Sequence, residues 1–445
     1  MSDTPATVPV PEHWYDPLAG LGIDLPRERP APEPAPGLKL NVPKQLVRQS
    51  MARQQRIPIP EPVRDAYARW RPTPLVRARG LERHLGTPAR IYYKDETRNL
   101  AGTHKLLTAV AQAHYYREAG ARRLITCTAA GQWGTSIALA TRQLGMECTI
   151  YMVRGSYDGK PARRTLMEML GAEVIRSPSD RTEAGRAALE RDPGEMGALG
   201  LAMTEAVEHA ARDDQAQWIL GGSEPFAILH TTLIGLEAID QLQAAGDWPD
   251  VVIGYMGGGK NLGGIAAPFL GSARPPRCLA VESAAYPALT RGRYAYDCTD
   301  ASGRTPMAKM YTLGRGFTTR PIRAQGMRYH AASKVISALR AAGRLDAKAY
   351  QERAVFDAAV DFARSEGVLP SPEASYAVRA ATDEAIAARE ADEHRVILFC
   401  LSDHGMFDTT AYQGYLDGEV TDADVTDTEI GESLKVLDTP EPVHA

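Results

Sequence analysis

Lys105 stands where a predicted strand gives way to a predicted helix, and an amine at such a position can become reactive. The apolar run at residues 89–93 predicts a strand, and small apolar residues predict a helix over residues 106–113. The positive end of that helix disfavours an ammonium group, and an amine kept neutral can form a Schiff base. The alternative is a solvent-exposed lysine on a surface helix, which is the commoner situation for a single lysine.

A glycine-rich turn lies between another predicted strand, residues 251–253, and a predicted helix. The backbone N–H groups of such a turn can converge on one anion, and the helix dipole adds to the attraction. The turn therefore predicts a phosphate site made by Gly257, Gly258, Gly259, Lys260 and Asn261.

Three other interpretations of this turn stay open. A Walker A loop for a nucleotide triphosphate requires Ser or Thr where Asn261 stands. A dinucleotide-binding turn would use Glu282, about twenty residues further on, as its ribose-binding acid, but Leu262 occupies the third glycine position. A tight turn without any ligand is the third, because glycine runs predict function only loosely.

Two more loops follow predicted strands. The loop from Cys127 to Gly134 offers small residues, a hydroxyl group and a helix N-terminus, which suits a carboxylate but equally fits an ordinary capped helix. In the other loop, the Ser402 hydroxyl can hydrogen-bond a ring nitrogen, whereas His404 has no second metal ligand at a recognisable spacing. A Schiff-base lysine, a phosphate turn, a carboxylate loop and a neutral ring partner together predict a pyridoxal phosphate site, with no metal.

The order of predicted elements indicates an α/β protein. Short β-rich runs alternate with helices from residue 89 onward, which predicts two domains with mostly parallel sheets flanked by helices. Proline-rich residues 1–40 predict an extended arm outside the core, followed by helical spacing over residues 43–57 and 62–70. The acidic residues 417–445 predict a peripheral segment.

Composition excludes several classes of partner. The 51 basic and 55 acidic residues give a formal net charge of −4, so we expect neither a nucleic acid nor a membrane as partner. Five widely spaced cysteines form no disulfide framework or zinc pattern. Without a signal peptide or a long apolar run, a cytoplasmic location is expected.

A string of motifs along nearly the whole chain resembles the β chain of tryptophan synthase, in its stand-alone second type. The motifs are Arg71-Pro-Thr-Pro-Leu75, Ala101-Gly-Thr-His-Lys105, Ala130-Gly-Gln-Trp-Gly134, Leu233-Ile-Gly-Leu-Glu237, Gly257-Gly-Gly259 with Asn261, Glu366-Gly-Val-Leu-Pro370, and Leu401-Ser402 with His404-Gly405. The resemblance implies a fold type II pyridoxal phosphate enzyme. Its expected parts are an N-terminal extension with helices (1–70), a larger cofactor-binding domain (71–103 and 223–435), a smaller mobile domain (104–222) and a tail (436–445).

The resemblance also assigns residues to roles. Lys105 corresponds to the lysine that carries the cofactor, His104 to its neighbour beside the phosphate, Ser402 to the ring-nitrogen partner, and Glu366 to the acid near the ring. The loop that grips the substrate carboxylate corresponds to Thr128, Ala129, Ala130, Gly131, Gln132 and Trp133. A small amino-acid substrate, a homodimer without an obligatory α subunit, and a monovalent cation as a second cofactor complete the expectation.

Departures from the family concern the second-substrate pocket. Cys127 replaces the glutamate that orients indole, and Ala129 replaces a glycine. Lys260 stands where the phosphate loop usually has serine, Asp403 stands where glycine is expected, and residues 221–226 differ from the usual segment. Glu224 could supply the missing acid from another loop. Cys127 could instead be a reactive nucleophile or a passive filler.

These observations predict amino-acid β-replacement through an aminoacrylate intermediate, with a nucleophile other than indole. Lys105 would remove the α-proton, and the neutral Ser402 would leave the ring nitrogen unprotonated, which favours β-chemistry over transamination. The alternatives are a serine or threonine dehydratase-type β-elimination and authentic tryptophan synthesis. A partner subunit without catalytic activity is disfavoured, because Lys105 is intact.

Overall fold

The computed structural model of the chain describes residues 8–32, 42–51, 53–219, 221–222, 224–300, 303–318, 321–423 and 425–437. The chain divides into two compact units. Unit 1 comprises Met1–Pro34, Ala52–His104 and Ser223–Ala445, and unit 2 comprises Ala35–Met51 and Lys105–Gly222. Residues 1–70, which the sequence analysis treats as a separate extension, are thus shared between the two units, and the predicted tail at 436–445 lies almost entirely outside the described residues.

Unit 1 is built on a six-stranded sheet whose neighbouring strands are parallel, except that β3 runs antiparallel to β4. The strand order is β13 (Asp346–Tyr350), β10 (Arg277–Ser283), β9 (Val251–Tyr255), β14 (Val396–Leu401), β4 (Arg90–Asp95) and β3 (Leu75–Arg77). Every residue of β14 is buried, as expected for a central strand covered on both faces.

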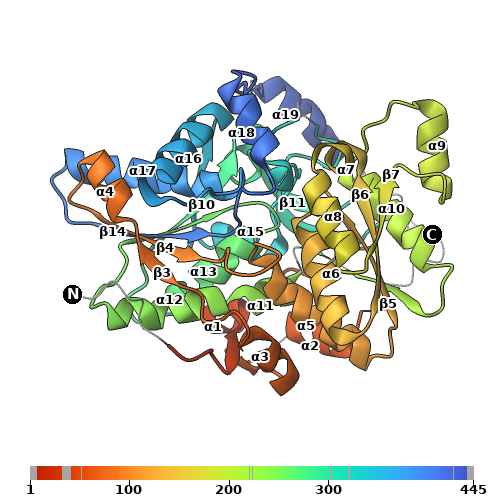
Figure 1. The fold of residues 1–445 in the computed structure, drawn as a ribbon, viewed down its shortest axis with the longest axis horizontal. Coiled ribbons are helices and arrows are strands. Elements are labelled where there is room, and N and C mark those ends of the chain that lie inside the picture. The colour runs from red at the N-terminus through yellow and green to blue at the C-terminus, as the bar shows by residue number, and fades with distance from the viewer. Residues whose placement is uncertain are drawn as a thin grey trace. The chain divides into compact units, whose positions relative to one another are not determined.

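Helices cover both faces of this sheet (Figure 1). Helix α17 (Ala374–Glu390) packs on β14 and β9 with α16 (Glu352–Glu366) against it, while α13 (Lys260–Leu270) lies on the other face with α12 (Leu233–Ala244) beside it. The remaining elements of unit 1 are β1 (His13–Tyr15), α1 (Pro17–Leu21), β2 (Arg56–Pro58), α3 (Glu61–Tyr67), α4 (Arg79–Leu85), α11 (Pro225–Thr231), α14 (Ala288–Arg291), β11 (Arg293–Cys298), β12 (Met307–Thr312), η1 (Gln325–Met327), α15 (Lys334–Ala341), α18 (Thr409–Leu416), α19 (Asp427–Leu434) and η2 (Lys435–Leu437).

Unit 2 contains a smaller, entirely parallel sheet in the order β7 (Glu173–Ser177), β6 (Glu147–Val153), β5 (Arg123–Thr128) and β8 (Ala216–Trp218). Helices α6 (Gln132–Leu144) and α10 (Leu199–Ala210) pack on this sheet, and α5 (Lys105–Glu118) packs on α6. The other helices are α2 (Lys44–Ser50), α7 (Arg154–Gly159), α8 (Pro161–Met169) and α9 (Glu183–Arg191). The predicted α/β class is therefore confirmed.

The N-terminal region differs from its prediction. Within the proline-rich residues 1–40, Trp14 is fully buried and its ring lies 4.6 Å from that of His230, so part of the expected arm belongs to the core of unit 1. The aromatic surface of Trp14 and Tyr15 outweighs the surrounding prolines, because burying such side chains is strongly favourable. The helical spacing over residues 43–57 is also only partly realised, since α2 ends at Ser50 and β2 follows.

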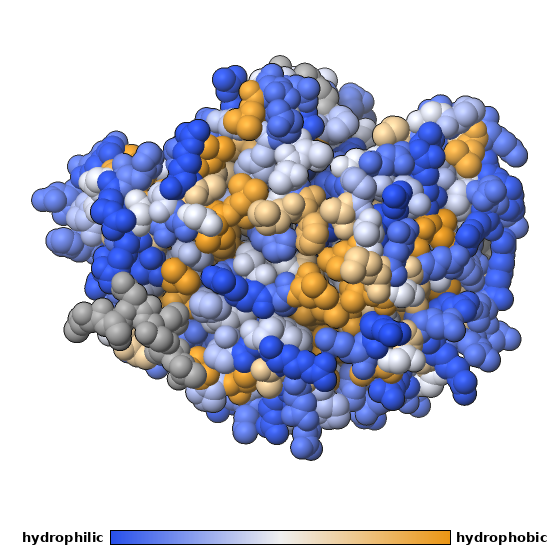
Figure 2. Space-filling view, viewed as in Figure 1, coloured by the Kyte–Doolittle hydropathy of each residue, from blue (hydrophilic) through white to orange (hydrophobic). Residues whose placement is uncertain are grey.

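Hydrophilic residues cover most of the face of the molecule seen in Figure 2, and hydrophobic residues reach the surface in several places. Met169 and Leu416 are among the large hydrophobic side chains that are exposed. No described helix combines the length and the apolar character that crossing a bilayer requires.

Candidate active site

Three adjacent parallel strands of unit 1, β9, β14 and β4, end at the same edge of the sheet. Ligands of open α/β sheets collect at the carboxyl ends of the strands. The segments that leave these strands contain the glycine turn after Tyr255, Ser402 after Leu401, and His104 at the end of the loop after Asp95. The fold thus brings together the predicted phosphate turn, the predicted ring partner and the predicted phosphate neighbour within unit 1.

The glycine turn between β9 and α13 requires its glycines. Gly259 has a φ of +83°, and a Cβ atom added to it would lie 2.6 Å from the Ser333 hydroxyl oxygen. A Cβ atom on Gly257 would lie 2.8 Å from the carbonyl oxygen of Gly326. Side chains are therefore excluded from a turn that leads directly into the N-terminus of α13, and the positive end of a helix favours an anion.

Asn261, on the first turn of α13, provides a test of the predicted phosphate. Its Oδ1 accepts a hydrogen bond from the Tyr255 backbone N–H at 3.0 Å, which fixes the orientation of the amide. Its Nδ2 is buried and finds no hydrogen-bond acceptor within the described part of the chain. The Cys400 thiol lies close to the amide, which acts to lower the pKa of this thiol, but burial raises that pKa by more. A buried donor needs an acceptor, and a phosphate oxygen at the turn would supply one. The residues present fit pyridoxal phosphate.

Lys260 does not point freely into solvent, because its side chain is buried. Its backbone carbonyl accepts a hydrogen bond from the Thr231 hydroxyl at 2.9 Å, which ties the start of α13 to the end of α11. The Lys260 side chain therefore lies within the protein.

Ser402 is bound to its neighbour Asp403. The Ser402 hydroxyl donates to Oδ2 of Asp403 at 2.5 Å, and both residues are completely buried. The Tyr255 hydroxyl approaches the same oxygen at 3.4 Å, and Nδ1 of His104 lies 3.7 Å from it. Burial and the charge of Asp403 raise the pKa of Tyr255 well above its ordinary value, so this phenol remains a donor.

His104 is fixed by the backbone of the β14 loop. Its N–H donates to the Ser402 carbonyl at 2.9 Å, and Thr103 pairs with Asp403 as an isolated β-bridge. The imidazole is buried and lies edge-on to the Tyr255 ring. Lys105 follows immediately, begins α5 as predicted and is half-buried, so the backbone at His104 anchors the point from which Lys105 extends.

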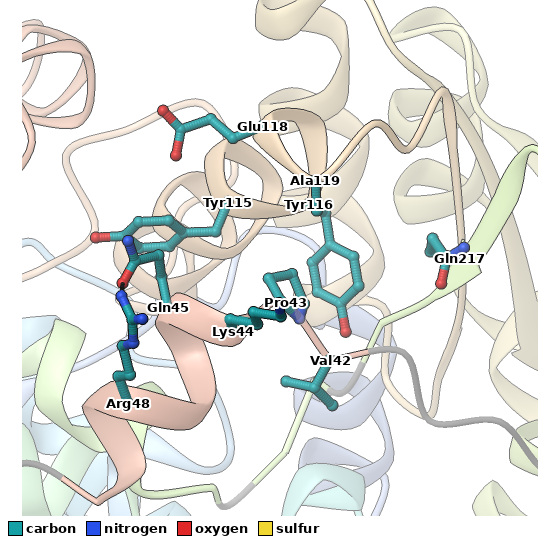
Figure 3. A pocket seen from close by; sticks show the side chains of 10 residues that line it. All are labelled: Val42, Pro43, Lys44, Gln45, Arg48, Tyr115, Tyr116, Glu118, Ala119 and Gln217. Carbon is teal, nitrogen blue, oxygen red and sulfur yellow. Dashed lines mark hydrogen bonds between the residues drawn. The ribbon is translucent and has the colours of Figure 1, made fainter.

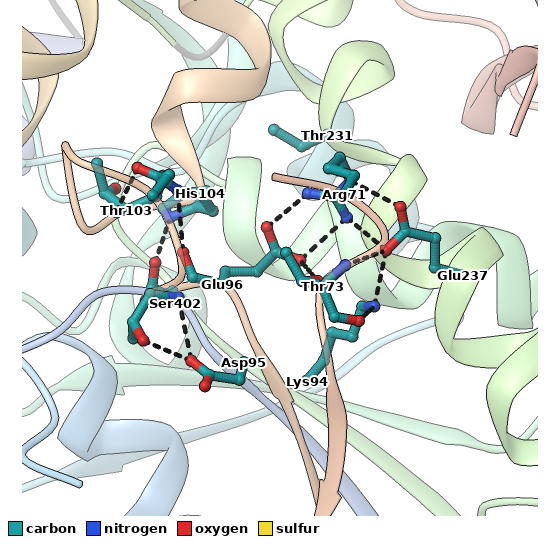
Figure 4. A network of polar contacts seen from close by, with 12 residues as sticks. Arg71, Thr73, Lys94, Asp95, Glu96, Thr103, His104, Thr231, Glu237 and Ser402 are labelled. Carbon is teal, nitrogen blue, oxygen red and sulfur yellow. Dashed lines mark hydrogen bonds and ion pairs between the residues drawn. The ribbon is translucent and has the colours of Figure 1, made fainter. Parts of the chain in front are cut away.

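A buried charge network holds the strand that carries this loop (Figure 4). Arg71 binds both carboxylate oxygens of Glu237 and both of Glu96, while Lys94 donates to Glu237 at 2.7 Å. Burial acts to raise the pKa of Glu237, but Arg71 and Lys94 lower it further than burial raises it. Because Lys94 lies on β4 and Glu237 on α12, the network fixes β4 against that helix.

The predicted carboxylate loop occupies the corresponding position in unit 2, at the carboxyl end of β5. Gly131 has a φ of +98° and precedes α6, and a Cβ atom on it would lie 3.2 Å from the side chain of the buried Arg163. The Trp133 indole donates to the Thr126 hydroxyl at 2.9 Å. The structure thus places Thr128, Ala129, Ala130, Gly131, Gln132 and Trp133 together at a helix N-terminus.

The two residues proposed to replace the family glutamate have different surroundings. Burial raises the pKa of the Cys127 thiol to about 12, so the group is neutral and a poor nucleophile near neutral pH. This disfavours Cys127 as a reactive nucleophile and favours the passive filler. Glu224 is partly exposed and pairs with Lys334 at 3.1 Å, which commits part of its charge to structure.

Glu366, predicted as the acid near the ring, is placed elsewhere in unit 1. Its Oε1 accepts the Leu81 N–H at 2.7 Å, so the carboxylate caps α4 at the C-terminal end of α16. A different carboxylate, Glu373, is buried and accepts the N–H of Gly326, whose carbonyl abuts Gly257. The charge of Glu373 also raises the pKa of Tyr255. Glu373 therefore replaces Glu366 as the acid near the glycine turn.

The sequence did not point to Glu373, because Glu366 stands in one of the motifs of the resemblance, whereas Glu373 lies after the loop that follows α16. The available signal was its position: Glu373 follows Pro370-Ser-Pro372 and directly precedes α17, at the start of a helix facing the central strands. Glu282, the candidate ribose acid, is buried and accepts the N–H groups of Leu289 and Thr290, so it caps α14.

A groove of about 660 Å³ in unit 2 is separate from the predicted site residues (Figure 3). It runs between α2 and the C-terminal half of α5, and Lys44, Arg48, Tyr115, Tyr116 and Glu118 are among its lining residues. Across the described residues, no three or more His, Cys, Asp or Glu side chains are grouped as metal ligands.

Comparison with known proteins agrees with the geometry of unit 1. Residues 68–403 match the family model described as "Pyridoxal-phosphate dependent enzyme". The chain is 47% identical to tryptophan synthase beta chain 2 of Aquifex aeolicus over 93% of this chain and 98% of that protein, and 46% identical to the chain of the same name from Methanosarcina mazei over 92% and 95%. The structure of processed threonine deaminase isoform 2 from Solanum lycopersicum has the same fold, with a TM-score of 0.60 at 18% identity over 93% of this chain and 98% of that one. The chain therefore belongs to the pyridoxal phosphate-dependent enzymes, and within them to the tryptophan synthase beta chains.

Proposed function

We propose that this enzyme catalyses β-replacement on a small amino acid and that its preferred incoming nucleophile is not indole. The observation that carries the second part is Cys127, a buried thiol whose pKa of about 12 keeps it neutral where the resemblance expects a glutamate. A neutral thiol is a weak hydrogen-bond acceptor compared with a carboxylate. The enzyme therefore lacks at this position the group that would pair with the N–H of indole.

Pyridoxal phosphate, when bound, supplies an aldehyde for covalent attachment and a ring that accepts electron density from the substrate. The backbone N–H groups at Gly257, Gly258 and Gly259, together with Asn261 Nδ2, would hold the phosphate. Ser402 would contact the ring nitrogen. Glu373 would lie near the ring, in the role first assigned to Glu366.

Lys105 would form the covalent bond to the cofactor and, once released by the substrate, take the α-proton. This role is supported by the backbone hydrogen bond from His104 to Ser402 and by the start of α5 at Lys105 itself. The loop from Thr128 to Trp133 would bind the substrate carboxylate through amides at the start of α6, with Gly131 allowing close approach.

Tests of cofactor attachment come first. Holoenzyme reduced with borohydride should carry the cofactor on the peptide that contains Lys105, and Lys105→Ala should carry none. Lys94→Met is not a suitable control, because Lys94 belongs to the buried charge network, whereas the exposed Lys435→Met should label like the parent chain. Labelling of a different lysine would overturn the proposed site.

Nucleophile preference is tested by substitution at Cys127. The enzyme is given serine, threonine or their O-phospho and O-acetyl forms with indole or with thiol, amine and carbon nucleophiles. We expect indole to be a poor substrate for the parent enzyme and for Cys127→Ser, and a better one for Cys127→Glu. Rapid tryptophan formation by the parent enzyme would refute the non-indole preference, and pyruvate or 2-oxobutyrate formed without a nucleophile would instead identify a dehydratase.

Assembly and location are part of the same proposal. We propose a homodimer that acts without an α subunit in the cytoplasm, because the relatives it resembles are of the stand-alone type. Sedimentation of the purified chain should give a dimer mass, and β-replacement should be measurable with this chain alone. A monomer, or activity that appears only after a second protein is added, would contradict this part.

A further inference from the structure

One departure from the family, Asp403, directly follows Ser402, the predicted partner of the ring nitrogen. Its carboxylate accepts the Ser402 hydroxyl at 2.5 Å, in the short range typical of a charge-assisted O–H···O bond. Both side chains are fully buried, so water does not compete for the contact. Glycine, which the resemblance expects here, would leave the Ser402 hydroxyl without this acceptor.

The groups around the Asp403 carboxylate show which atoms donate a proton in its hydrogen bonds. Ser402 and Tyr255 both approach Oδ2 with hydroxyl groups, at 2.5 and 3.4 Å, and Tyr255 keeps its proton because its pKa is raised by burial and by the charge of Asp403. The imidazole of His104 lies 3.7 Å from the same oxygen. Oδ2 is thus surrounded by donors, which fits an ionised carboxylate that only accepts.

A serine hydroxyl has one proton, and in this structure that proton is directed at Asp403. Towards any second partner the Ser402 oxygen therefore presents only lone pairs. An unprotonated pyridine nitrogen also presents only a lone pair, so the two atoms would repel each other. A protonated ring nitrogen, by contrast, can donate to Ser402 Oγ and continue a chain of hydrogen bonds that ends at the carboxylate.

We propose that Asp403, acting through Ser402, keeps the ring nitrogen of pyridoxal phosphate protonated in this enzyme. This inference rests on the proposed function, which places Ser402 against the ring nitrogen, and it reverses the expectation of an unprotonated ring drawn from Ser402 alone. Asp403 is a positioning residue, since it acts through the Ser402 hydroxyl.

The consequence concerns how strongly the ring withdraws electrons. A protonated ring is the better acceptor of the charge left when the substrate α-proton is removed. The enzyme should therefore exchange the α-proton of an amino acid that has no β-leaving group, such as alanine, faster than an otherwise equal enzyme without Asp403.

The direct test is the ¹⁵N NMR signal of holoenzyme loaded with pyridoxal phosphate labelled at the ring nitrogen, without substrate. We expect the parent enzyme to show the upfield signal of a protonated nitrogen. Asp403→Gly should move the signal downfield, towards the unprotonated position. Tyr255→Phe removes a hydroxyl that contacts both Ser402 and Oδ2 of Asp403 but keeps the Ser402–Asp403 bond, and should leave the signal upfield.

A second variant, Asp403→Asn, keeps the test possible if Asp403→Gly does not fold. Asp403→Asn preserves the shape of the side chain and removes its charge, so its signal should also move downfield. Solvent deuterium exchange at the α-carbon of alanine should slow at least tenfold in whichever variant folds. A parent signal at the unprotonated position, or an upfield signal that persists in both Asp403 variants, would overturn the proposal.

Failure of this inference and failure of the proposed function give different results. If the ring nitrogen is unprotonated but cofactor attaches to Lys105 and serine undergoes β-replacement, only the role of Asp403 is wrong. If the Ser402→Ala variant leaves the ¹⁵N signal of the parent unchanged, Ser402 does not contact the ring nitrogen, and the proposed arrangement of the site is wrong as well.

Discussion

Arg71 and Glu237 form a completely buried two-point ion pair, in which Nε and Nη2 of the arginine donate to the two carboxylate oxygens at 2.7 and 2.9 Å. The pair joins the segment before β3 to α12, and Lys94 on β4 shares the same carboxylate. Burial lowers the pKa of Lys94, and Glu237 and Glu96 oppose this only in part, whereas Arg71 and Lys94 hold the pKa of Glu237 below its ordinary value. The network therefore stabilises the fold only while it is complete.

Removing Glu237 should expose this dependence. Glu237→Ala leaves the buried Arg71 and Lys94 with one remaining carboxylate, Glu96, and breaking a buried pair from one side typically costs about 3–5 kcal/mol. We expect a large fall in the urea midpoint of unit 1. Asp24→Asn breaks the exposed Arg53–Asp24 pair and should leave the midpoint unchanged. Equal effects of the two substitutions would contradict the role of the network.

The glycine turn offers a matched pair of substitutions. Gly259 and Gly246 both have positive φ, +83° and +73°, but only at Gly259 would a Cβ atom meet a close neighbour, Ser333. Alanine at either position should lose about 1–2 kcal/mol of stability through backbone strain. Only Gly259→Ala should also weaken the binding of pyridoxal phosphate, measured by fluorescence titration of apoenzyme. Cofactor affinity that falls equally in Gly246→Ala would argue against a phosphate at this turn.

Much of this arrangement was predictable from sequence. The helix at Lys105, the strand before Ser402 and the turn at Gly257–Gly259 follow from local apolar periodicity and glycine placement, and the structure contains each of them. Three parallel strands then bring the loops to one edge, as α/β folds require. Local patterns were sufficient because each of these residues lies next to the end of a regular element.

What sequence did not predict depends on contacts between distant segments. The burial of Trp14 depends on His230, more than two hundred residues away, and no local pattern in a proline-rich stretch reveals such a partner. Glu366 ends α16 and Glu373 precedes α17 seven residues later, and their surroundings differ: Glu366 contacts α4, whereas Glu373 contacts Gly326. Likewise, the bond between Asp403 and Ser402 is a matter of side-chain direction, which adjacency in sequence does not determine.

These two glutamates can be separated by experiment. Glu373→Gln retains an oxygen that accepts the Gly326 N–H but removes the charge near the glycine turn, so turnover should fall at least tenfold with little change in Tm. Glu366→Gln weakens the cap of α4, which should cost about 1 kcal/mol of stability and leave kcat unchanged. The reverse pattern, with kcat lost only in Glu366→Gln, would restore Glu366 as the acid near the ring.

Glu282 should make stability depend on pH in an unusual direction. Burial raises its pKa to about 7, and hydrogen bonds from Thr290 and Leu289 only partly oppose this. Because the folded state holds this proton more tightly than the unfolded state, whose pKa is about 4.5, the stabilisation is complete below pH 4.5 and is lost as pH rises through 7. At about 1.4 kcal/mol per pKa unit, the loss is on the order of 3 kcal/mol.

Glutamine at position 282 carries no titrating proton, so the difference in Tm between Glu282→Gln and the parent enzyme should shift in favour of the variant between pH 5 and pH 8. Glu352→Gln should show the same trend, because burial also raises the pKa of Glu352 to about 7. A flat profile for Glu282→Gln would mean that Glu282 is already ionised in the folded protein and that its cap on α14 is a charged one.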